Sequence, residues 1–294
     1  MIVLTMIAKR FSMQVSLLLF LKVTGLFVML IIDVTAYSQD ERTQYFPHTR
    51  PLLKSLPLKK DVWIYILAGQ SNMAGRGVVQ PMDTVPDKRI LTINAQGDIV
   101  IAKEPLHFYE PQLTGLDCGM AFAKRLLKDV DENVTILLIP AAVGGSSSHQ
   151  WLGDSVHRGV RLMTNFQQRV SSATKYGIIK GILWHQGESD TNDQDIPGYG
   201  DRLNKIFWEF RRHCSNPDLP IFIGKLGSFS DNQSRWNAIN QAIEKYASGD
   251  KYSFVIETAD LKAKEDKIHF DAEGQRSMGI RMAESYLAEL KRKR

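Results

Sequence analysis

Residues 62–75 read Val-Trp-Ile-Tyr-Ile-Leu-Ala-Gly-Gln-Ser-Asn-Met-Ala-Gly. The run 62–67 is apolar, rich in β-branched and aromatic side chains, and is closed by Gly69, which is the pattern of a buried β-strand. Because polar residues do not alternate with apolar ones, both faces of this strand are expected to be covered by helices, as in a parallel sheet. The polar segment that follows then lies at the carboxyl end of the strand, where such sheets bind ligands.

Four more runs of the same kind follow along the chain. They lie at 134–139, 178–184, 221–226 and 252–256. Between the runs, apolar residues recur at helical spacing. The ranges expected to be helical are 120–127, 160–170, 199–210, 236–246 and 278–286. Alternation of strand and helix over about 200 residues predicts an α/β fold of three layers, α/β/α, around a doubly wound and mainly parallel sheet.

The composition of the 294 residues is that of an ordinary globular chain, with 44% hydrophobic and 23% charged residues. It excludes extensive disorder, collagen and coiled coil. The net charge of +5 includes a basic run at 291–294, which reads as a solvated helix end, and no basic stripe typical of nucleic-acid binding is present. Cys118 and Cys214 are too few for a disulfide framework or a four-ligand zinc site, and the sequence leaves their pairing open.

The first 38 residues have the pattern of an export signal. Lys9 and Arg10 precede an apolar stretch whose second part, 23–32, has the length of a signal-peptide core rather than the roughly 20 residues of a spanning helix. Small residues before position 39 predict cleavage after Ser38, with a retained N-terminal anchor as the alternative. We therefore expect a signal peptide or anchor at 1–38, a lead-in segment at 39–60, one domain at 61–294, and a secreted or periplasmic location.

Four loops carry chemically active residues. They are Gly-Gln-Ser-Asn-Met-Ala-Gly at 69–75, Pro-Ala-Ala-Val-Gly-Gly-Ser-Ser-Ser at 140–148, His-Gln-Gly-Glu-Ser-Asp at 185–190, and Asp-Lys-Ile-His-Phe-Asp at 266–271. All four are expected to meet at one edge of the sheet. The first is neither a phosphate loop nor a dinucleotide motif, and Met73 stands where the α/β-hydrolase elbow requires its second glycine.

Ser71 lies at a strand-to-helix turn, where we expect its hydroxyl to be exposed, and a serine becomes a nucleophile only when a base takes its proton. Among the seven histidines, His269 has a carboxylate, Asp266, three residues upstream in a loop expected to lie near the sheet edge. That spacing lets the carboxylate hold one ring nitrogen while the other faces Ser71. His185 is the alternative base, although it reads as a packed histidine at a strand end. Asp271 is the alternative to Asp266, although it reads as the N-cap of the last helix.

Taken in order, Gly-Gln-Ser-Asn-Met, Gly-Gly-Ser-Ser, Trp-His-Gln-Gly-Glu-Ser-Asp and Asp-x-x-His resemble the SGNH/GDSL hydrolase superfamily. Within it, the match is to the sialate O-acetylesterase-like and carbohydrate esterase branch, which includes acetylxylan esterases. The resemblance runs from about residue 62 to the C-terminal helix and implies a flavodoxin-like SGNH hydrolase fold. Gln70 replaces the Asp of Gly-Asp-Ser and Gln186 replaces the oxyanion Asn, and both departures are usual for this branch.

The resemblance implies that Ser71 is the nucleophile, His269 the general base and acid, and Asp266 the residue that orients His269. It also implies an oxyanion hole made by the Ser71 N–H, the Gly145 N–H and the Gln186 side-chain amide, with Gly144 as the alternative glycine. Supporting roles are expected for Gln70, Asn72, Gly144 and Glu188.

The expected function is an exported serine esterase that removes O-acetyl groups from an acetylated oligo- or polysaccharide of the acetylxylan or sialic-acid type. No cofactor and no metal are expected, since His185 with Glu188 is too sparse for a metal site. Trp151 reads either as a sugar-stacking or as a core residue. One alternative is a lipid or thioester hydrolase of the same superfamily, and another is a non-catalytic carbohydrate-binding domain. The sequence leaves open the sugar, the acetyl position and the oligomeric state.

Overall fold

The computed structural model describes residues 42–53 and 55–292. Its centre is a seven-stranded sheet with the order β3-β2-β4-β1-β7-β8-β9. Neighbouring strands run parallel, except for the antiparallel pair β2 and β3. The strands are β1 (Val62–Gly69), β2 (Ile90–Ile93), β3 (Ile99–Ile101), β4 (Thr135–Pro140), β7 (Ile178–His185), β8 (Ile221–Gly224) and β9 (Ser253–Ile256).

The strand order creates a crevice beside β1. The strands β4-β1-β7-β8-β9 follow the 2-1-3-4-5 order of flavodoxin-like sheets, with the β2–β3 pair added next to β4. From β1 the chain first builds one side of the sheet and later returns to build the other side, starting with β7. Ligands bind outside the carboxyl ends of the strands at such a switch point. The predicted three-layer α/β/α fold is confirmed.

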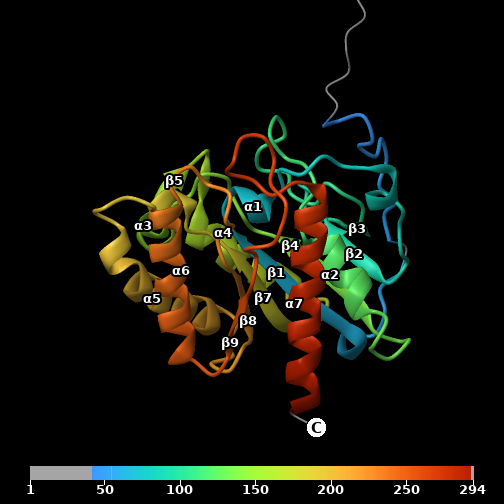
Figure 1. Cartoon of the computed structure of the whole chain (residues 1–294). Coiled ribbons are helices and arrows are strands. Elements are labelled where there is room, and N and C mark those ends of the chain that lie inside the picture. The colour runs from blue at the N-terminus through green and yellow to red at the C-terminus, as the bar shows by residue number, and fades with distance from the viewer. Residues whose placement is uncertain (1–41, 54, 293–294) are drawn as a thin grey trace, which may run out of the picture. The chain divides into compact units, whose positions relative to one another are not determined.

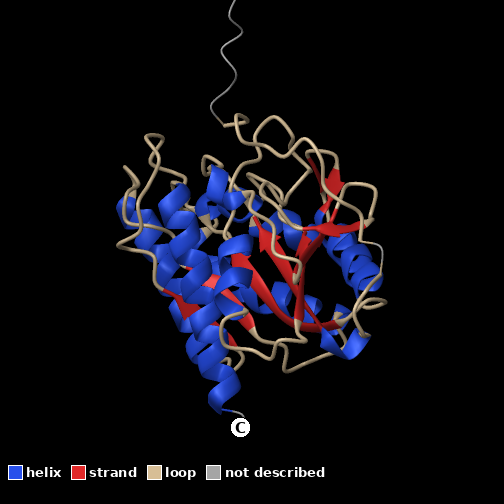
Figure 2. Cartoon of the chain, turned by 90° about the vertical axis from the view of Figure 1, so that its right-hand side faces the viewer, coloured by secondary structure: helices blue, strands red, loops and turns tan. Residues whose placement is uncertain are grey.

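Helices cover both faces of the sheet, with α5 and α6 on one side and α2 and α7 on the other (Figure 1). Seen from the side, the strands lie between helices (Figure 2). The helices are α1 (Ser71–Ala74), α2 (Gly119–Leu126), α3 (Ser148–Gly153), α4 (Leu162–Ala173), α5 (Tyr199–His213), α6 (Gln233–Ser248) and α7 (Ala272–Arg292). Short 3₁₀ turns are η1 (Lys59–Asp61), η2 (Pro81–Asp83), η3 (Glu188–Asp190) and η4 (Ile196–Gly198).

Both faces of β1 are buried, which explains why its sequence is apolar throughout. Ile64 and Ile66 pack into the core under α4, α5 and α6, whereas Tyr65 and Leu67 pack into the core under α2 and α7. All four side chains are fully buried. Burying an apolar side chain of this size contributes about 1.5–3 kcal/mol, so both faces of β1 stabilise the sheet and hold its carboxyl end in place.

The structure contains elements that the sequence pattern did not predict. The strands β2 and β3 are four and three residues long, too short to show a clear period. A two-stranded hairpin, β5 (Val156–His157) and β6 (Val160–Arg161), precedes α4. The helix predicted from residue 160 therefore begins at Leu162, because Arg161 has extended backbone angles and pairs with Val156.

Part of the expected lead-in segment packs along the sheet edge. Leu52 bridges Val100, the Leu53 N–H donates to the Ile99 carbonyl at 3.2 Å, and the Ile101 N–H donates to Pro51 at 3.3 Å. The predicted signal segment 1–38 lies outside the described residues. Within the described ranges, the structure contains no helix whose length and apolar character would let it span a bilayer.

Candidate active site

The close approach of β1 to β7 positions Ser71. The Gln70 N–H donates to the His185 carbonyl at 2.9 Å. Gly69 has φ of +137°, and a Cβ at this position would lie 2.1 Å from the His185 oxygen. Only glycine fits there, and α1 begins two residues later with Ser71. The Ser71 residue is only 6% exposed, which differs from the exposed turn hydroxyl expected from the sequence.

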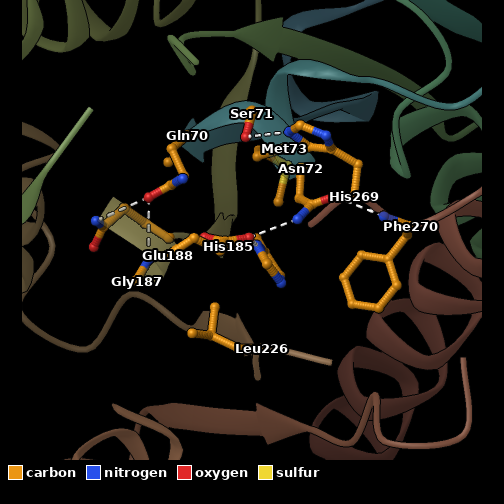
Figure 3. Close-up of polar contacts among 12 residues, drawn as sticks. Gln70, Ser71, Asn72, Met73, His185, Gly187, Glu188, Leu226, His269 and Phe270 are labelled. Atoms are coloured by element: carbon orange, nitrogen blue, oxygen red, sulfur yellow. Dashed lines mark hydrogen bonds and ion pairs between the residues drawn. The ribbon is translucent and has the colours of Figure 1, made fainter. Parts of the chain in front are cut away.

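Ser71, His269 and Asp266 form one line of hydrogen bonds (Figure 3 shows the first). Ser71 Oγ lies 2.9 Å from His269 Nε2, and His269 Nδ1 lies 2.8 Å from Asp266 Oδ2. The alternative carboxylate, Asp271, accepts the Gly274 N–H at 2.7 Å and so caps α7. The structure thus brings together the three residues expected to react.

The loop that carries His269 is folded back on itself and anchored to α1. Asp266 Oδ1 accepts the N–H groups of Ile268 at 3.0 Å and His269 at 2.9 Å, which places the acid and the imidazole on one turn. Asn72 then holds the loop, accepting the Phe270 N–H at 3.0 Å and donating to the Ile268 carbonyl at 3.1 Å (Figure 3). The backbone on either side of His269 is therefore held by Asn72.

The charge of Asp266 suits the tautomer of His269. Partial burial raises the pKa of Asp266, but hydrogen bonds from the His269 ring and from the His269 and Ile268 N–H groups outweigh it, so the net pKa lies below its usual value. An ionised Asp266 accepts a proton-bearing Nδ1. The Nε2 lone pair of His269 is then left to face the Ser71 hydroxyl.

The two loop glycines differ in their hydrogen bonds. The Gly144 N–H donates to Glu110 Oε2 at 2.5 Å. The Gly145 N–H has no partner within residues 42–53 and 55–292, and Gly145 lines the same cavity as Ser71. Its φ of +74° is a left-handed conformation that favours glycine. Of the two, Gly145 is the residue with a free donor beside the serine.

The structure contradicts the expected position of the Gln186 side chain. Gln186 is fully buried, and its Nε2 donates to Gln70 Oε1 and Ser146 O, both at 3.2 Å, and to Asp190 Oδ2 at 2.5 Å. Its Oε1 accepts from the Tyr199 hydroxyl at 3.1 Å. With both amide hydrogens engaged by loop acceptors, this side chain has no donor left for a substrate. Gln186 instead ties the loops together beneath the site.

Gln70 is the glutamine with a free amide nitrogen. Its Oε1 accepts the Gly187 N–H at 3.3 Å, the Ser189 N–H at 3.2 Å and Gln186 Nε2, so three donors fix the direction of the amide (Figure 3). Its Nε2 has no acceptor in the described part of the chain, and Gln70 lines the cavity next to Ser71. The side-chain donor beside the serine is therefore Gln70 rather than Gln186.

Glu188 connects the loop after β7 to α1. Its Oε1 accepts from Asn72 Nδ2 at 2.5 Å (Figure 3). Asn72 in turn holds the loop of His269, so Glu188 supports the imidazole through one intermediate side chain. The supporting positions predicted from the sequence thus lie around Ser71.

Comparison with known proteins identifies the chain. Residues 61–288 match the family described as carbohydrate esterase, sialic acid-specific acetylesterase. The chain belongs to this carbohydrate esterase family. A probable carbohydrate esterase of Arabidopsis thaliana is 30% identical over 249 residues, which cover 76% of this chain and 90% of that protein. The resemblance inferred from the four loops is confirmed, and the protein is an ester hydrolase of this family.

Solved structures share the fold of the esterase. An X-ray structure of an Arabidopsis thaliana protein has a TM-score of 0.67 and 28% identity, and the match covers 77% of the esterase and 98% of that chain. A carbohydrate acetylesterase from Xanthomonas citri has the same fold with a TM-score of 0.57 at 18% identity, covering 76% of the esterase and 55% of that chain.

The site of the esterase opens into a cavity of about 540 Å³. Leu113 and Ile268 are the large apolar side chains of its lining, and apart from Gly145 the other lining residues are polar or charged. Its basic side chains are those of Arg42, Arg76, Arg158 and Lys264. Two larger cavities, of about 880 and 640 Å³, are both lined by the exposed Trp208 of α5. Neither is lined by Ser71, His269, Asp266 or Gly145. Of these three cavities, the one over Ser71 has a serine in hydrogen-bond contact with a histidine in its lining.

Other sequence candidates have structural roles in the esterase. His185 is fully buried, with Nε2 3.0 Å from the Lys225 carbonyl. Trp151 is also fully buried and donates to Ser146 Oγ at 3.1 Å, so it packs in the core. Cys118 and Cys214 are not bonded to each other. Among residues 42–53 and 55–292, no group of three or more His, Cys, Asp or Glu side chains is arranged to hold a metal ion.

Three residues next to the loop that contains Gly144 and Gly145, called the glycine loop below, were missed by the sequence analysis. Glu110, Arg158 and His157 all contact one another or Gly144. Glu110 comes from an irregular loop, and the other two come from the short β5–β6 hairpin. Neither segment has a periodic pattern or a motif, so no signal in the sequence could have placed them beside Gly144.

Proposed function

We propose that the esterase removes O-acetyl groups from carbohydrate through an acetyl-enzyme on Ser71, and that it acts after export. One observation carries this proposal, namely the unbroken chain from Asp266 through His269 to Ser71, with contacts of 2.8 and 2.9 Å. Nucleophile, base and orienting acid in hydrogen-bond reach of one another are what acyl transfer requires.

In the first step, Ser71 Oγ attacks the carbonyl carbon of the acetyl group while His269 Nε2 takes the hydroxyl proton. Asp266, ionised because hydrogen bonds hold its pKa low, stabilises the imidazolium through Nδ1–H. The tetrahedral intermediate then collapses. The bond from the acetyl carbon to the sugar oxygen breaks, and His269 returns its proton to that oxygen, which releases the sugar hydroxyl and leaves acetyl-Ser71.

In the second step, a water molecule replaces the sugar. His269 Nε2 takes a proton from the water as its oxygen attacks the acetyl-enzyme carbonyl. Collapse of the second tetrahedral intermediate breaks the bond to Ser71 Oγ and releases acetic acid. His269 gives the proton back to Ser71, so the enzyme returns to its starting state without a net change in protons.

Three donors are placed to stabilise the negative oxygen that forms in both steps. The Ser71 N–H and the Gly145 N–H have no protein partner in the described ranges, and Gln70 Nε2 is free beside them. Removing one donor of this kind costs roughly 2.7–4 kcal/mol in other serine hydrolases. We assign the side-chain donor to Gln70, because the amide hydrogens of Gln186 are already engaged.

The lining of the cavity favours a sugar over a lipid. Leu113 and Ile268 are the two large apolar side chains of the lining, so an extended acyl chain would have few apolar side chains to pack against. Hydroxyl-rich rings instead match the many polar and charged side chains of the lining. Lys264, which lines the cavity and donates to the Arg76 carbonyl at 3.0 Å rather than to a carboxylate, favours an acetylated sugar that carries a carboxylate, as sialic acids do, over neutral acetylxylan.

Export rests on the pattern of residues 1–38, with cleavage after Ser38. N-terminal sequencing of the protein recovered from its native cells tests it. A mature chain beginning at Gln39 in the secreted or periplasmic fraction is expected, and an intact chain in the cytoplasm would contradict export.

The Ser71→Ala variant tests the nucleophile. We expect loss of 4-nitrophenyl acetate hydrolysis with a nearly unchanged melting temperature, because Ser71 loses a single hydroxyl. Ser171→Ala, at an exposed serine of α4, is the matched control and keeps full activity. Acetylated sialic acid, acetylxylan and lipid esters compared by kcat/KM then test the substrate. A folded Ser71→Ala protein that still hydrolyses the ester would rule out the mechanism.

A further inference from the structure

Both backbone groups of Gly144 are held by side chains. Its N–H donates to Glu110 Oε2 at 2.5 Å, and its carbonyl lies 2.9 Å from His157 Nε2. The next residue, Gly145, supplies the free N–H beside Ser71. The two contacts therefore fix the peptide units on either side of Gly144, immediately before the donor that the reaction needs.

The neighbours of His157 determine which ring nitrogen carries the proton. Gln150 Oε1 accepts the Ser147 N–H at 2.9 Å, so the amide nitrogen of Gln150 is the group that faces His157 Nδ1, at 3.1 Å. A donor facing Nδ1 makes that nitrogen an acceptor. The proton of the neutral ring is then on Nε2, where it is donated to the Gly144 carbonyl.

A trans peptide transmits this contact to Gly145. The Gly144–Gly145 bond is trans, and in a planar trans peptide the carbonyl and the following N–H point in opposite directions. When His157 holds the Gly144 oxygen on one side, the Gly145 N–H must point to the other side. Gly145 lines the cavity that also contains Ser71.

The β5–β6 hairpin presents His157 to the loop. His157 pairs with Val160, and the two residues at the turn, Arg158 and Gly159, have φ of +49° and +78°, as a tight two-residue hairpin turn requires. Arg158 also donates to Glu110 Oε1, and Arg76 donates to Glu110 Oε2 at 3.0 Å. The hairpin thus contacts the glycine loop both directly and through Glu110.

We propose that His157 is a positioning residue, which aims the Gly145 N–H at the oxyanion by holding the Gly144 carbonyl, while Glu110 holds the preceding N–H. This inference rests on the proposed function of Ser71. Without the His157 donor the Gly144–Gly145 peptide is free to rotate, so the Gly145 N–H moves off the oxyanion. Binding of the ground-state ester does not use that donor and is unaffected.

Three variants of His157 test the proposal. His157→Phe keeps a ring but has no donor. His157→Gln places an amide N–H near the position of Nε2, and His157→Glu has the same length but only accepts hydrogen bonds when ionised. Arg161→Ala is the matched control, because Arg161 lies in the same hairpin but faces Asp154, 3.7 Å away, rather than the glycine loop. Each is assayed for kcat and KM on 4-nitrophenyl acetate, for phenylboronic acid inhibition, and for melting temperature.

We expect His157→Phe and His157→Glu to lower kcat by up to about 100-fold, as displacements of about 1 Å do in active sites, with KM unchanged. The inhibition constant of phenylboronic acid, which forms a tetrahedral adduct, rises in parallel. His157→Gln recovers most of kcat, and Arg161→Ala matches the native enzyme. If His157→Phe does not fold, the comparison of kcat between His157→Gln and His157→Glu tests the proposal.

A folded His157→Phe protein with native kcat would overturn the proposal. So would His157→Gln and His157→Glu variants that both have native kcat. So would a loss that appears only in KM or melting temperature. Failure of the proposed function looks different, because the native enzyme would then show no hydrolysis that depends on Ser71.

Discussion

The same substitution, glutamine to glutamate, is expected to lower kcat at position 70 and to lower the melting temperature at position 186. In Gln70→Glu, a carboxylate oxygen still accepts the Gly187 N–H, the Ser189 N–H and Gln186 Nε2, which lie at 3.2–3.3 Å from Oε1 in the native protein. The free Nε2 donor is replaced by a second oxygen. The loops therefore keep their contacts while the site loses one oxyanion donor.

Gln70→Glu is expected to lower kcat strongly and to change the free energy of unfolding little. Removing one oxyanion donor costs about 10²–10³ in kcat, and a negative charge beside the oxyanion makes the upper part of that range the expectation. KM changes little, because the donor acts mainly once the carbonyl oxygen becomes negative. The melting temperature stays close to that of the native enzyme.

At position 186 the expected loss is in stability. Gln186→Glu places an oxygen against the Asp190 carboxylate, the Ser146 carbonyl and Gln70 Oε1, in a fully buried environment. Breaking a buried charged or polar network of this kind costs about 3–5 kcal/mol. For a domain of this size each kcal/mol lowers Tm by about 2–4 °C, so Tm falls by roughly 10 °C.

Steady-state kinetics on 4-nitrophenyl acetate and thermal melts by circular dichroism separate the two cases, with kcat normalised to folded protein. Gln70→Asn and Gln186→Asn are the matched controls that shorten each side chain without adding charge. A Gln70→Glu enzyme with native kcat would refute the assignment of the donor. A Gln186→Glu enzyme with native Tm and a thousandfold lower kcat would return the role to Gln186.

Three further outcomes follow from the geometry. Asp266→Asn leaves His269 without the carboxylate that fixes its tautomer, and we expect kcat to fall by up to about 10⁴, as in the serine protease triad, with a small change in Tm because the Asp266 side chain is 39% exposed. Burial raises the pKa of Asp250, but hydrogen bonds from Tyr246 and Arg211 and from nearby N–H and hydroxyl groups lower it to about 2. Because this folded-state pKa is depressed, the stabilisation is complete above about pH 4 and is lost as pH falls toward 2, so urea unfolding should show a loss of stability between these pH values that Asp250→Asn lacks. Activity is expected to survive dialysis against a chelator, since a serine mechanism needs no metal, and a loss that added metal restores would contradict this.

The sequence predicted the parts of the site that depend on strand ends. Ser71 and the glycine loop follow apolar runs that had to be parallel strands, so their meeting at one edge follows from topology. His269 was found through the three-residue spacing to Asp266, which one turn of chain can close. In each case the signal is local, because a strand period or a short spacing carries it.

Gln186 shows what local signals cannot decide. A residue that directly follows a strand of the active-site edge can face the cavity or the layer beneath it. The choice depends on Asp190 and on Tyr199 of α5, which hold the Gln186 amide from below. His157 and Glu110 were missed for a related reason, since their contacts to Gly144 arise only when a hairpin and an irregular loop pack together.

The central claim is that Ser71 carries the acetyl group during turnover. Acid quenching of the enzyme within milliseconds of mixing with 4-nitrophenyl acetate, followed by peptide mass spectrometry, measures this directly. The mechanism predicts one acetyl group on the peptide that contains Ser71, absent from Ser71→Ala and lost on longer incubation as water releases it. Turnover without acetylation, or an acetyl group carried by another residue of an active enzyme, would contradict the claim.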